Sequence, residues 1–218
     1  MKRFYLFIVI VTTVLQTSAQ NVAKNDPDAK AILDNVSTKF KTFKTAKATF
    51  TYRVENSAGK VLSTKAGTVF MKGTKYQVAI IGQEIFCDGK NIWTYDKSSN
   101  EVTITTLDTE SSTLTPQKLF TNFYDQDFLY KLNGEKKQGT KTIQEIEMTP
   151  TDKSKPFHKV YVYIDKLGKT LNSTKVLEKS GSRYSYIVNS LIPNSAIPDS
   201  QFAFDLKKYP GVEVIDLR

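Results

Sequence analysis

The residue types that most often perform acid–base or nucleophilic chemistry are scarce in this sequence. His158 is the single histidine and Cys87 the single cysteine among 218 residues. A serine–histidine–aspartate arrangement would depend on His158, which follows Pro156-Phe157 at the start of a predicted strand, where a surface or turn histidine is the simpler interpretation. Cys87 lies in an apolar strand, as a buried small hydrophobic residue would. Neither residue indicates catalysis, and we expect no enzyme.

Motifs that would hold a metal ion, a nucleotide or a cofactor are also missing. The sequence has no glycine-rich phosphate loop, no paired Cys-x-x-Cys and no Asp-x-Asp-x-Asp-Gly calcium loop. Glu145 and Glu147 share one face of a predicted strand, and a solvated surface explains that pair. We therefore expect no catalytic, metal or cofactor site. Because glycosidases and similar enzymes often lack local signatures, a lipid or glycan hydrolase is kept as an alternative.

Large apolar and aromatic side chains are abundant instead. The chain has 13 phenylalanines, 11 tyrosines and one tryptophan. The concave face of a meandering sheet is either filled by helices or left as a pocket. Most of these aromatic residues must be ordinary core residues, so we expect only a subset of them to contact a ligand.

Residues 1–19 have the composition of a cleaved secretory signal. Lys2 and Arg3 give a positive start, an apolar stretch runs from Phe4 to Leu15, and the small residues 17–19 offer a cleavage site. A bacterial lipoprotein would have a cysteine directly after that site, where this chain has Gln20. We expect residues 20–218 to form a single unanchored domain in the periplasm.

The charge balance is basic. Removing Lys2 and Arg3 from the 31 basic residues leaves 29 against 22 acidic residues, a net charge of about +7. Such a surface suits anionic headgroups or an acidic partner, but scattered lysines also keep an exposed β-protein soluble and protect its edge strands. Export argues against nucleic acid as a partner, and we expect a monomer.

Two periodicities divide the chain into elements. Asp26 and Pro27 form an N-cap followed by a first-turn proline, and apolar residues recur at three- and four-residue intervals up to Phe40, which predicts an amphipathic helix. From Ala46 the period changes to two, and short alternating runs separated by turn residues continue to residue 106 and resume at residue 128. Between them, Thr115-Pro116 repeats the cap-plus-proline signature and predicts a short inserted helix.

Four short segments carry a family resemblance. They are Ala48-Thr49-Phe50-Thr51-Tyr52, Asp88-Gly89-Lys90-Asn91-Ile92-Trp93-Thr94-Tyr95, Leu119-Phe120, and Phe202-Ala203-Phe204 leading to Pro210-Gly211-Val212-Glu213-Val214. They are spread over nearly all of residues 20–218, and the second segment is the most specific. With the order of elements, they make the chain resemble the periplasmic lipoprotein carrier family, LolA, and its superfamily of lipoprotein-localisation and acyl-binding domains.

The resemblance implies a mainly β fold with α, namely an unclosed antiparallel half-barrel of about 10–11 strands. An N-terminal helix and a short inserted lid helix would cover a hydrophobic cavity. Such a carrier takes acylated lipoproteins from an inner-membrane lipoprotein-releasing ABC transporter to the outer membrane, where the sequence identifies no acceptor. By resemblance, the positions near the cavity or lid are Phe50, Tyr76, Trp93, Leu119, Phe120 and Phe204. Apolar residues beside them complete the predicted acyl-binding set: Tyr52, Val69, Met71, Val78, Phe86 and Phe123.

One departure from the family concerns how the lid is held. Members carry an arginine after the Met-Lys end of an early strand, and it holds the lid closed by hydrogen bonds to the helix backbone. Here Met71-Lys72 is followed by Gly73. Lys72 and Lys75 are the candidates to replace that arginine, although an ammonium group does not reproduce a planar group with five donors.

Two other functions of the same fold remain open at this stage. A periplasmic regulatory domain would bind lipid or mislocalised lipoprotein and form a stable complex with a membrane signalling protein. A carrier of another lipid would have the same oily hollow and a different cargo. The sequence does not separate these cargoes.

Overall fold

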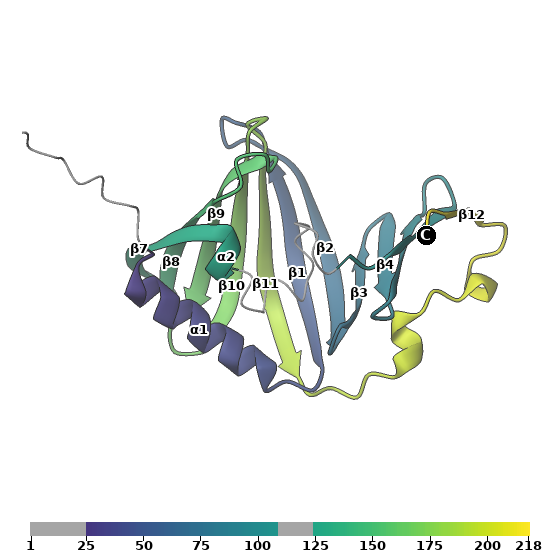
Figure 1. Cartoon of the computed structure of the whole chain (residues 1–218), viewed down its shortest axis with the longest axis horizontal. Coiled ribbons are helices and arrows are strands. Elements are labelled where there is room, and N and C mark those ends of the chain that lie inside the picture. The colour runs from purple at the N-terminus through teal and green to yellow at the C-terminus, as the bar shows by residue number, and fades with distance from the viewer. Residues whose placement is uncertain (1–24, 109–123) are drawn as a thin grey trace, which may run out of the picture.

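The computed structural model describes residues 25–108 and 124–218, apart from the side chains of residues 125 and 126. Figure 1 shows one broad sheet with a helix, α1, lying across several of its strands. The predicted signal at residues 1–19 lies outside the described residues, and so do Leu119, Phe120 and Phe123 of the predicted inserted helix.

Within the described residues, twelve strands form a single sheet in the order β12-β6-β5-β4-β3-β2-β1-β11-β10-β9-β8-β7. Their bounds are β1 (Ala46–Glu55), β2 (Val61–Lys72), β3 (Lys75–Ile80), β4 (Gln83–Cys87), β5 (Asn91–Asp96), β6 (Glu101–Thr106), β7 (Phe128–Gln138), β8 (Lys141–Pro150), β9 (Phe157–Asp165), β10 (Thr170–Glu178), β11 (Arg183–Pro193) and β12 (Glu213–Asp216).

The sheet consists of two antiparallel meanders, β1 to β6 and β7 to β11. They meet where β1 pairs with β11, with Tyr52 opposite Tyr186. β12 adds to β6 in parallel, with Val214 beside Val102. Since β7 and β12 are the two ends of the strand order, the sheet is not closed into a barrel. The predicted unclosed, mainly antiparallel sheet is confirmed, with twelve strands where the sequence predicted about ten or eleven.

Four helical elements accompany the sheet in the described part of the chain. α1 spans Pro27–Lys41 and α2 spans Tyr124–Asp127, while two 3-10 helices, η2 (Asp199–Phe202) and η3 (Leu206–Lys208), lie in the C-terminal segment. The N-terminal helix expected from Asp26-Pro27 is therefore confirmed, with Asp26 as its N-cap. Among the described helices, none is long and apolar enough to cross a membrane.

The two faces of the sheet are covered by different parts of the chain. We call the face that packs against α1 the inner face; it carries the main core, including Leu33 and Val36 of α1 with Ile146 and Ile164 of the sheet. We call the opposite face the outer face. We call residues 194–218 the C-terminal segment, drawn in yellow in Figure 1. Its residues 199–209 cover the outer face over β3 to β5, and its last part, β12, joins the sheet beside β6.

Candidate acyl-binding site

The N-terminal end of α1 is attached to the edge strand β7 by one carboxylate. Asp26 Oδ1 accepts hydrogen bonds from the backbone N–H groups of Asp28, at 2.8 Å, and Ala29, at 3.3 Å. Its other oxygen, Oδ2, accepts from the N–H of Leu132 at 2.9 Å, and its own N–H donates to the carbonyl of Tyr130 at 3.1 Å. The bond from Leu132 is the main reason that the pKa of Asp26 lies below its ordinary value. Asp26 thus caps the helix and ties it to the sheet.

The C-terminal end of α1 is attached to the turn between β9 and β10. Lys39 Nζ donates to the carbonyl oxygen of Gly168 at 2.5 Å. A basic residue in the last helical turn also interacts favourably with the negative end of the helix dipole. The helix is therefore held at both ends by polar contacts.

The middle of α1 is linked to α2. Tyr124 donates its phenol hydrogen to Asp34 Oδ1 at 2.8 Å, and Lys30 forms an ion pair with the same carboxylate at 3.0 Å. Burial disfavours the ionised form of Asp34, but these two hydrogen bonds outweigh it and hold its pKa below the ordinary value. Tyr124 itself is 2 % exposed. The contact places α2 directly beside the helix that covers the inner face.

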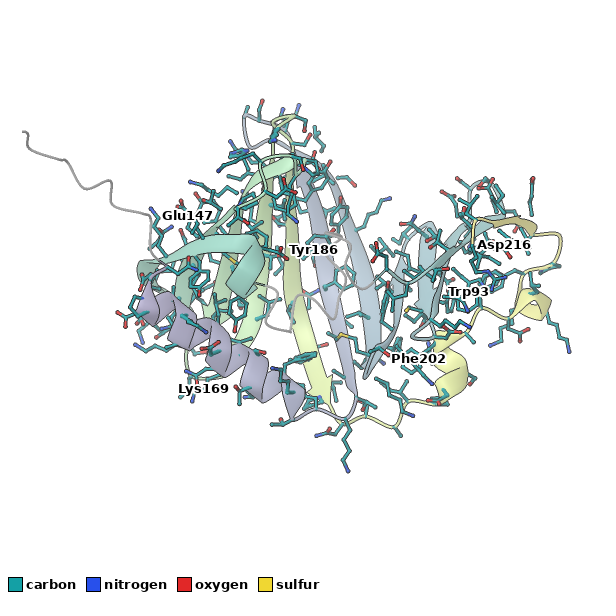
Figure 2. All side chains as sticks on the ribbon, in the orientation of Figure 1. Trp93, Glu147, Lys169, Tyr186, Phe202 and Asp216 are labelled. Carbon is teal, nitrogen blue, oxygen red and sulfur yellow. The ribbon has the colours of Figure 1, made fainter. Side chains whose placement is uncertain are left out.

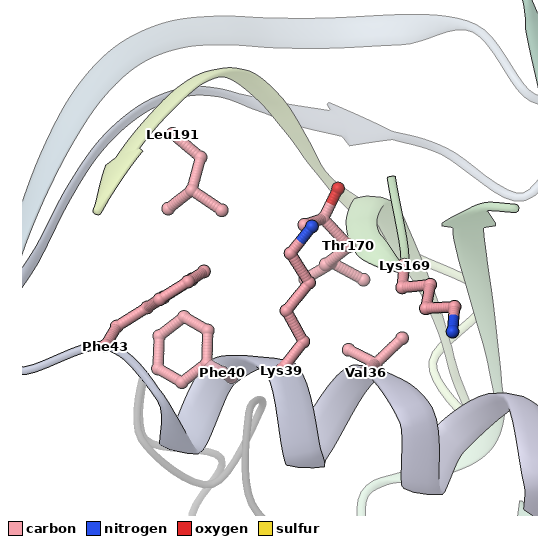
Figure 3. A pocket seen from close by; sticks show the side chains of 8 residues that line it. Val36, Lys39, Phe40, Phe43, Lys169, Thr170 and Leu191 are labelled. Carbon is pink, nitrogen blue, oxygen red and sulfur yellow. The ribbon is translucent and has the colours of Figure 1, made fainter. Parts of the chain in front are cut away.

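An apolar stripe of α1 rests on the sheet between these attachments. Ala29, Leu33 and Val36 are buried, and Ile32 and Phe40 pack beside them. Figure 3 shows the crevice between α1 and strands β10 and β11, with an empty volume of about 180 Å³ that includes open solvent. Its lining residues are Val36, Lys39, Phe40, Phe43, Lys169, Thr170, Leu171 and Leu191. The crevice is too narrow for a water molecule, so an acyl chain needs α1 to move away from the sheet.

The inner face continues from this crevice across β1 and β2. Phe50 on β1 is 8 % exposed and lies opposite Gly67 on β2. A Cβ atom added to Gly67 would lie 2.4 Å from Cζ of the Phe50 ring, closer than real atoms approach. The missing side chain of Gly67 therefore provides the space in which the phenyl ring lies over β2.

Six of the predicted acyl-binding residues share this inner face. They belong to one apolar cluster with the α1 stripe and lie on β1, β2 and β3: Phe50, Tyr52, Val69, Met71, Tyr76 and Val78. Burial raises the pKa of Tyr76, which lies opposite the buried Cys87. The structure brings these six together, and their contact with a ligand remains a prediction.

Phe86, Trp93 and Phe204 lie elsewhere. Phe86 is opposite both Gln77 and Trp93, so these side chains point to the outer face, away from Tyr76. The Phe86 ring meets Phe204 of the C-terminal segment edge to face, with ring centroids 5.6 Å apart. The structure therefore separates these three from the inner-face residues: alternate residues of a strand face opposite ways, and Phe204 belongs to the segment that covers the outer face. We leave them out of the site.

Other inner-face residues were missing from the sequence-based set. Leu171 and Leu191 form part of the crevice under α1, and Tyr184 and Tyr186 of β11 stand beside Tyr52. The alternation Tyr184-Ser185-Tyr186 already indicates two aromatic side chains on one face. Which face they share becomes known only from the pairing of β11 with β1.

The two residues considered for chemistry have the surroundings that the sequence indicated. Cys87 is completely buried and burial raises the pKa of its thiol, while His158 is exposed. Across residues 25–108 and 124–218, no group of three or more His, Cys, Asp or Glu side chains could hold a metal ion.

A comparison with protein families decides which family this open sheet belongs to. The family described as outer membrane lipoprotein carrier protein LolA matches residues 41–205, most of the chain. The chain belongs to the LolA family. The resemblance carried by the four short segments is thereby confirmed.

Curated relatives agree with this assignment to LolA, and a solved structure shares the fold. An outer-membrane lipoprotein carrier protein of Pseudomonas putida is 27% identical over 180 residues, which cover 78% of this chain and 80% of the relative. One of the same description from Cupriavidus pinatubonensis is also 27% identical, with 79% and 81% covered. A crystal structure of an uncharacterised conserved protein from Thermus thermophilus matches with a TM-score of 0.59 at 13% identity, covering 87% of this chain and 99% of that one, and supports the fold.

This LolA-family chain uses its two candidate latch residues elsewhere. Lys72 Nζ lies 2.7 Å from one carboxylate oxygen of Asp199 and Lys75 Nζ 3.0 Å from the other. Both lysines share the outer face with Gln77, and Asp199 begins η2 of the C-terminal segment. Among the described residues, Lys72 and Lys75 therefore hold the C-terminal segment, and neither bonds to α1. The predicted lid residues Leu119, Phe120 and Phe123 lie outside the described residues, so a contact of either lysine with the lid stays a prediction.

Proposed function

We propose that this protein is a periplasmic carrier that binds the acyl chains of lipoproteins between α1 and the inner face of the sheet, and transports them from the inner to the outer membrane. The observation that carries the proposal is the cover of the inner face: one amphipathic helix with an apolar stripe, held by polar contacts at its two ends. Membership of the LolA family supports it.

The energetics suit reversible loading. Lifting α1 exposes the buried side chains of Ala29, Leu33 and Val36 together with Leu171 below them. Each methylene group of a cargo chain that leaves water contributes roughly 0.8 kcal/mol. Burial of a long acyl chain therefore offsets the free energy lost when the apolar side chains of α1 and the sheet are exposed. The difference between the two states stays small, and cargo can be handed on.

We include the predicted lid residues Leu119, Phe120 and Phe123 in the proposed acyl-binding set, beside the six inner-face residues. The proposed donor is an inner-membrane lipoprotein-releasing ABC transporter. The role needs a monomer that has left the membrane after signal cleavage and that performs no reaction of its own.

The experiment combines cargo identification with a binding assay. Mass spectrometry of material that co-purifies with the protein from periplasm should find acylated lipoproteins, and a fluorescent acyl probe should bind the purified protein. Leu171→Gln, on the floor under α1, should weaken probe binding. Its control is Leu167→Gln, because Leu167 is 94 % exposed in the adjacent turn and should not matter.

Two results would contradict the proposal. Equal probe affinity in both leucine variants and in Phe120→Glu would show that chains do not bind under α1. A stable complex with a membrane signalling protein, without lipoprotein cargo, would indicate a sensing role.

A further inference from the structure

Three tyrosines form a group on the inner face beyond Phe50. Tyr52 of β1 stacks on Tyr184 of β11 with ring centroids 6.0 Å apart and an interplanar angle of 7°. Its ring is also 5.0 Å from that of Tyr186, directly opposite it in the register. Figure 2 shows Tyr186 midway along the strands, away from α1. At 36 % exposure, Tyr186 is accessible to a ligand that enters from that side.

A buried hydroxyl lies next to these rings. Thr174 of β10 is opposite Tyr186 on one side and the core residue Val162 on the other, so it too points to the inner face. Thr174 is 3 % exposed, and its Oγ1 has no hydrogen-bond partner in the described structure. A buried hydroxyl without a partner costs stability, which a ligand atom at this place would restore.

The tyrosine hydroxyls are available as donors. No hydrogen bond joins them to the residues that the structure describes. Burial, with the neighbouring Tyr186, Tyr184 and Glu178, raises the pKa of Tyr52 to about 12, and burial also raises that of Tyr186. The phenols of Tyr52 and Tyr186 therefore keep their protons at neutral pH and present O–H groups to a ligand.

The charge nearby selects among ligands that accept hydrogen bonds. Glu178 of β10 acts on the Tyr52 phenol, and its negative charge disfavours a carboxylate or phosphate on that side, while the positive Lys65 opposite Tyr52 on β2 is exposed to water, which screens it. Ester and amide carbonyls accept hydrogen bonds without carrying charge. Among the parts of an acylated molecule, the linkage that joins the chains to the polar body matches this site best.

We name Tyr52, Thr174, Tyr184 and Tyr186 the tyrosine site. We propose that the tyrosine site binds the neutral ester and amide linkages of acylated cargo, while the chains extend past Phe50 toward α1. The inference rests on the proposed function, since it assigns the polar end of the same ligand.

The test uses two probes that differ in polar groups. The first is a synthetic diacylglyceryl-cysteine lipopeptide with a fluorophore on its peptide, and the second is diphenylhexatriene, which is purely hydrocarbon. The variants are Y52F/Y184F/Y186F and Thr174→Val. The control is Y161F/Y163F, because Tyr161 and Tyr163 form a stacked pair on the outer face.

We expect the triple variant to weaken lipopeptide binding by about tenfold, the loss of a few hydrogen bonds, and to weaken diphenylhexatriene binding far less, because the three aromatic rings stay in place. Thr174→Val should weaken lipopeptide binding by severalfold and, without ligand, should raise the urea midpoint of unfolding. The outer-face control should match the wild type in every measurement. A free fatty acid should bind more weakly than its methyl ester.

The possible failures are distinct. Wild-type protein that binds neither probe would refute the proposed function and the tyrosine site together. Wild-type protein that binds both, with the triple variant equal to it for the lipopeptide, would overturn the tyrosine site alone. An equal loss of both probes in the triple variant would also overturn it, because that pattern reports altered packing.

Discussion

The contact between Phe50 and Gly67 gives a prediction whose sign depends on the packing of the inner face. Ala in place of Gly within a strand normally stabilises a protein by roughly 0.5–1 kcal/mol. Here the new Cβ would lie 2.4 Å from Cζ of Phe50, and ordinary contact begins at 3.4 Å, so the ring must move by about 1 Å. Overpacking of this kind costs roughly 1–3 kcal/mol. We expect Gly67→Ala to lower the free energy of unfolding by about 1–2 kcal/mol.

The same substitution should stabilise the protein once the ring is gone. Phe50→Val removes every ring atom near Gly67 and is destabilising by itself because a buried side chain is truncated. In that background Gly67→Ala should raise the free energy of unfolding by about 0.5–1 kcal/mol. The four proteins form a double-mutant cycle, measured by urea unfolding with linear extrapolation.

A neighbouring position supplies the control. Ala66 is exposed on the outer face of the same strand. Ala66→Gly should therefore lower the free energy of unfolding by about 0.5–1 kcal/mol, both in the wild-type protein and in the Phe50→Val background. Additive effects of Gly67→Ala and Phe50→Val, or a stabilising Gly67→Ala in the wild-type background, would refute this description of the inner face.

Four further substitutions test the attachments of α1 and of the C-terminal segment. Asp26→Asn keeps a capping oxygen but places an amide donor against the N–H of Leu132; it should cost about 1 kcal/mol at neutral pH. Folding lowers the pKa of Asp26, so its carboxylate stabilises the protein at pH values above the unfolded pKa, and this stabilisation is lost as the pH falls through the folded pKa. The free energies of unfolding of wild type and variant should therefore converge in acid. A difference that persists at pH 2 would argue against this role of the carboxylate. Lys72→Ala and Lys75→Ala should leave acyl-probe affinity unchanged, since both lysines contact Asp199 on the outer face. A clear rise in probe exchange would show that they latch the predicted lid. Phe202 is fully buried, so Phe202→Ala should lower the free energy of unfolding by about 3–5 kcal/mol, while the folded protein should bind the acyl probe as the wild type does. A lower probe affinity of the folded protein would mean that the outer face and the inner face are coupled.

The elements of this fold were predictable because their signals are local. The cap and proline at Asp26-Pro27 give the start of α1, and period-two alternation from Ala46 gives β1. Residues 88–91 predict the hairpin between β4 and β5, where the Asp88 carboxylate accepts the N–H groups of Lys90 and Asn91. Val212 and Val214 alternate with polar residues and so favour a last strand, although its parallel pairing with β6 brings together residues far apart in the sequence.

The composition of the site was less predictable, because it depends on which face each strand turns toward α1. A shift of one residue in a strand exchanges the two faces, so Phe86 and Trp93 were grouped with Tyr76 although they point the other way. The role of Gly67 has no local signal either, since it follows from a phenyl ring on a neighbouring strand. Family resemblance predicts the kind of site, and the strand register decides which residues share the face under α1.

The position of Trp93 has a practical consequence for anyone who follows loading by spectroscopy. It is the only tryptophan of the chain, and its side chain shares the outer face with Phe86. Its emission would report movement of the covering C-terminal segment and stay constant while lipid enters on the other side. Tyr52, Tyr184 and Tyr186 contribute to tyrosine absorbance and lie on the inner face. Tyrosine absorbance is therefore the intrinsic signal that would change when a ligand binds there.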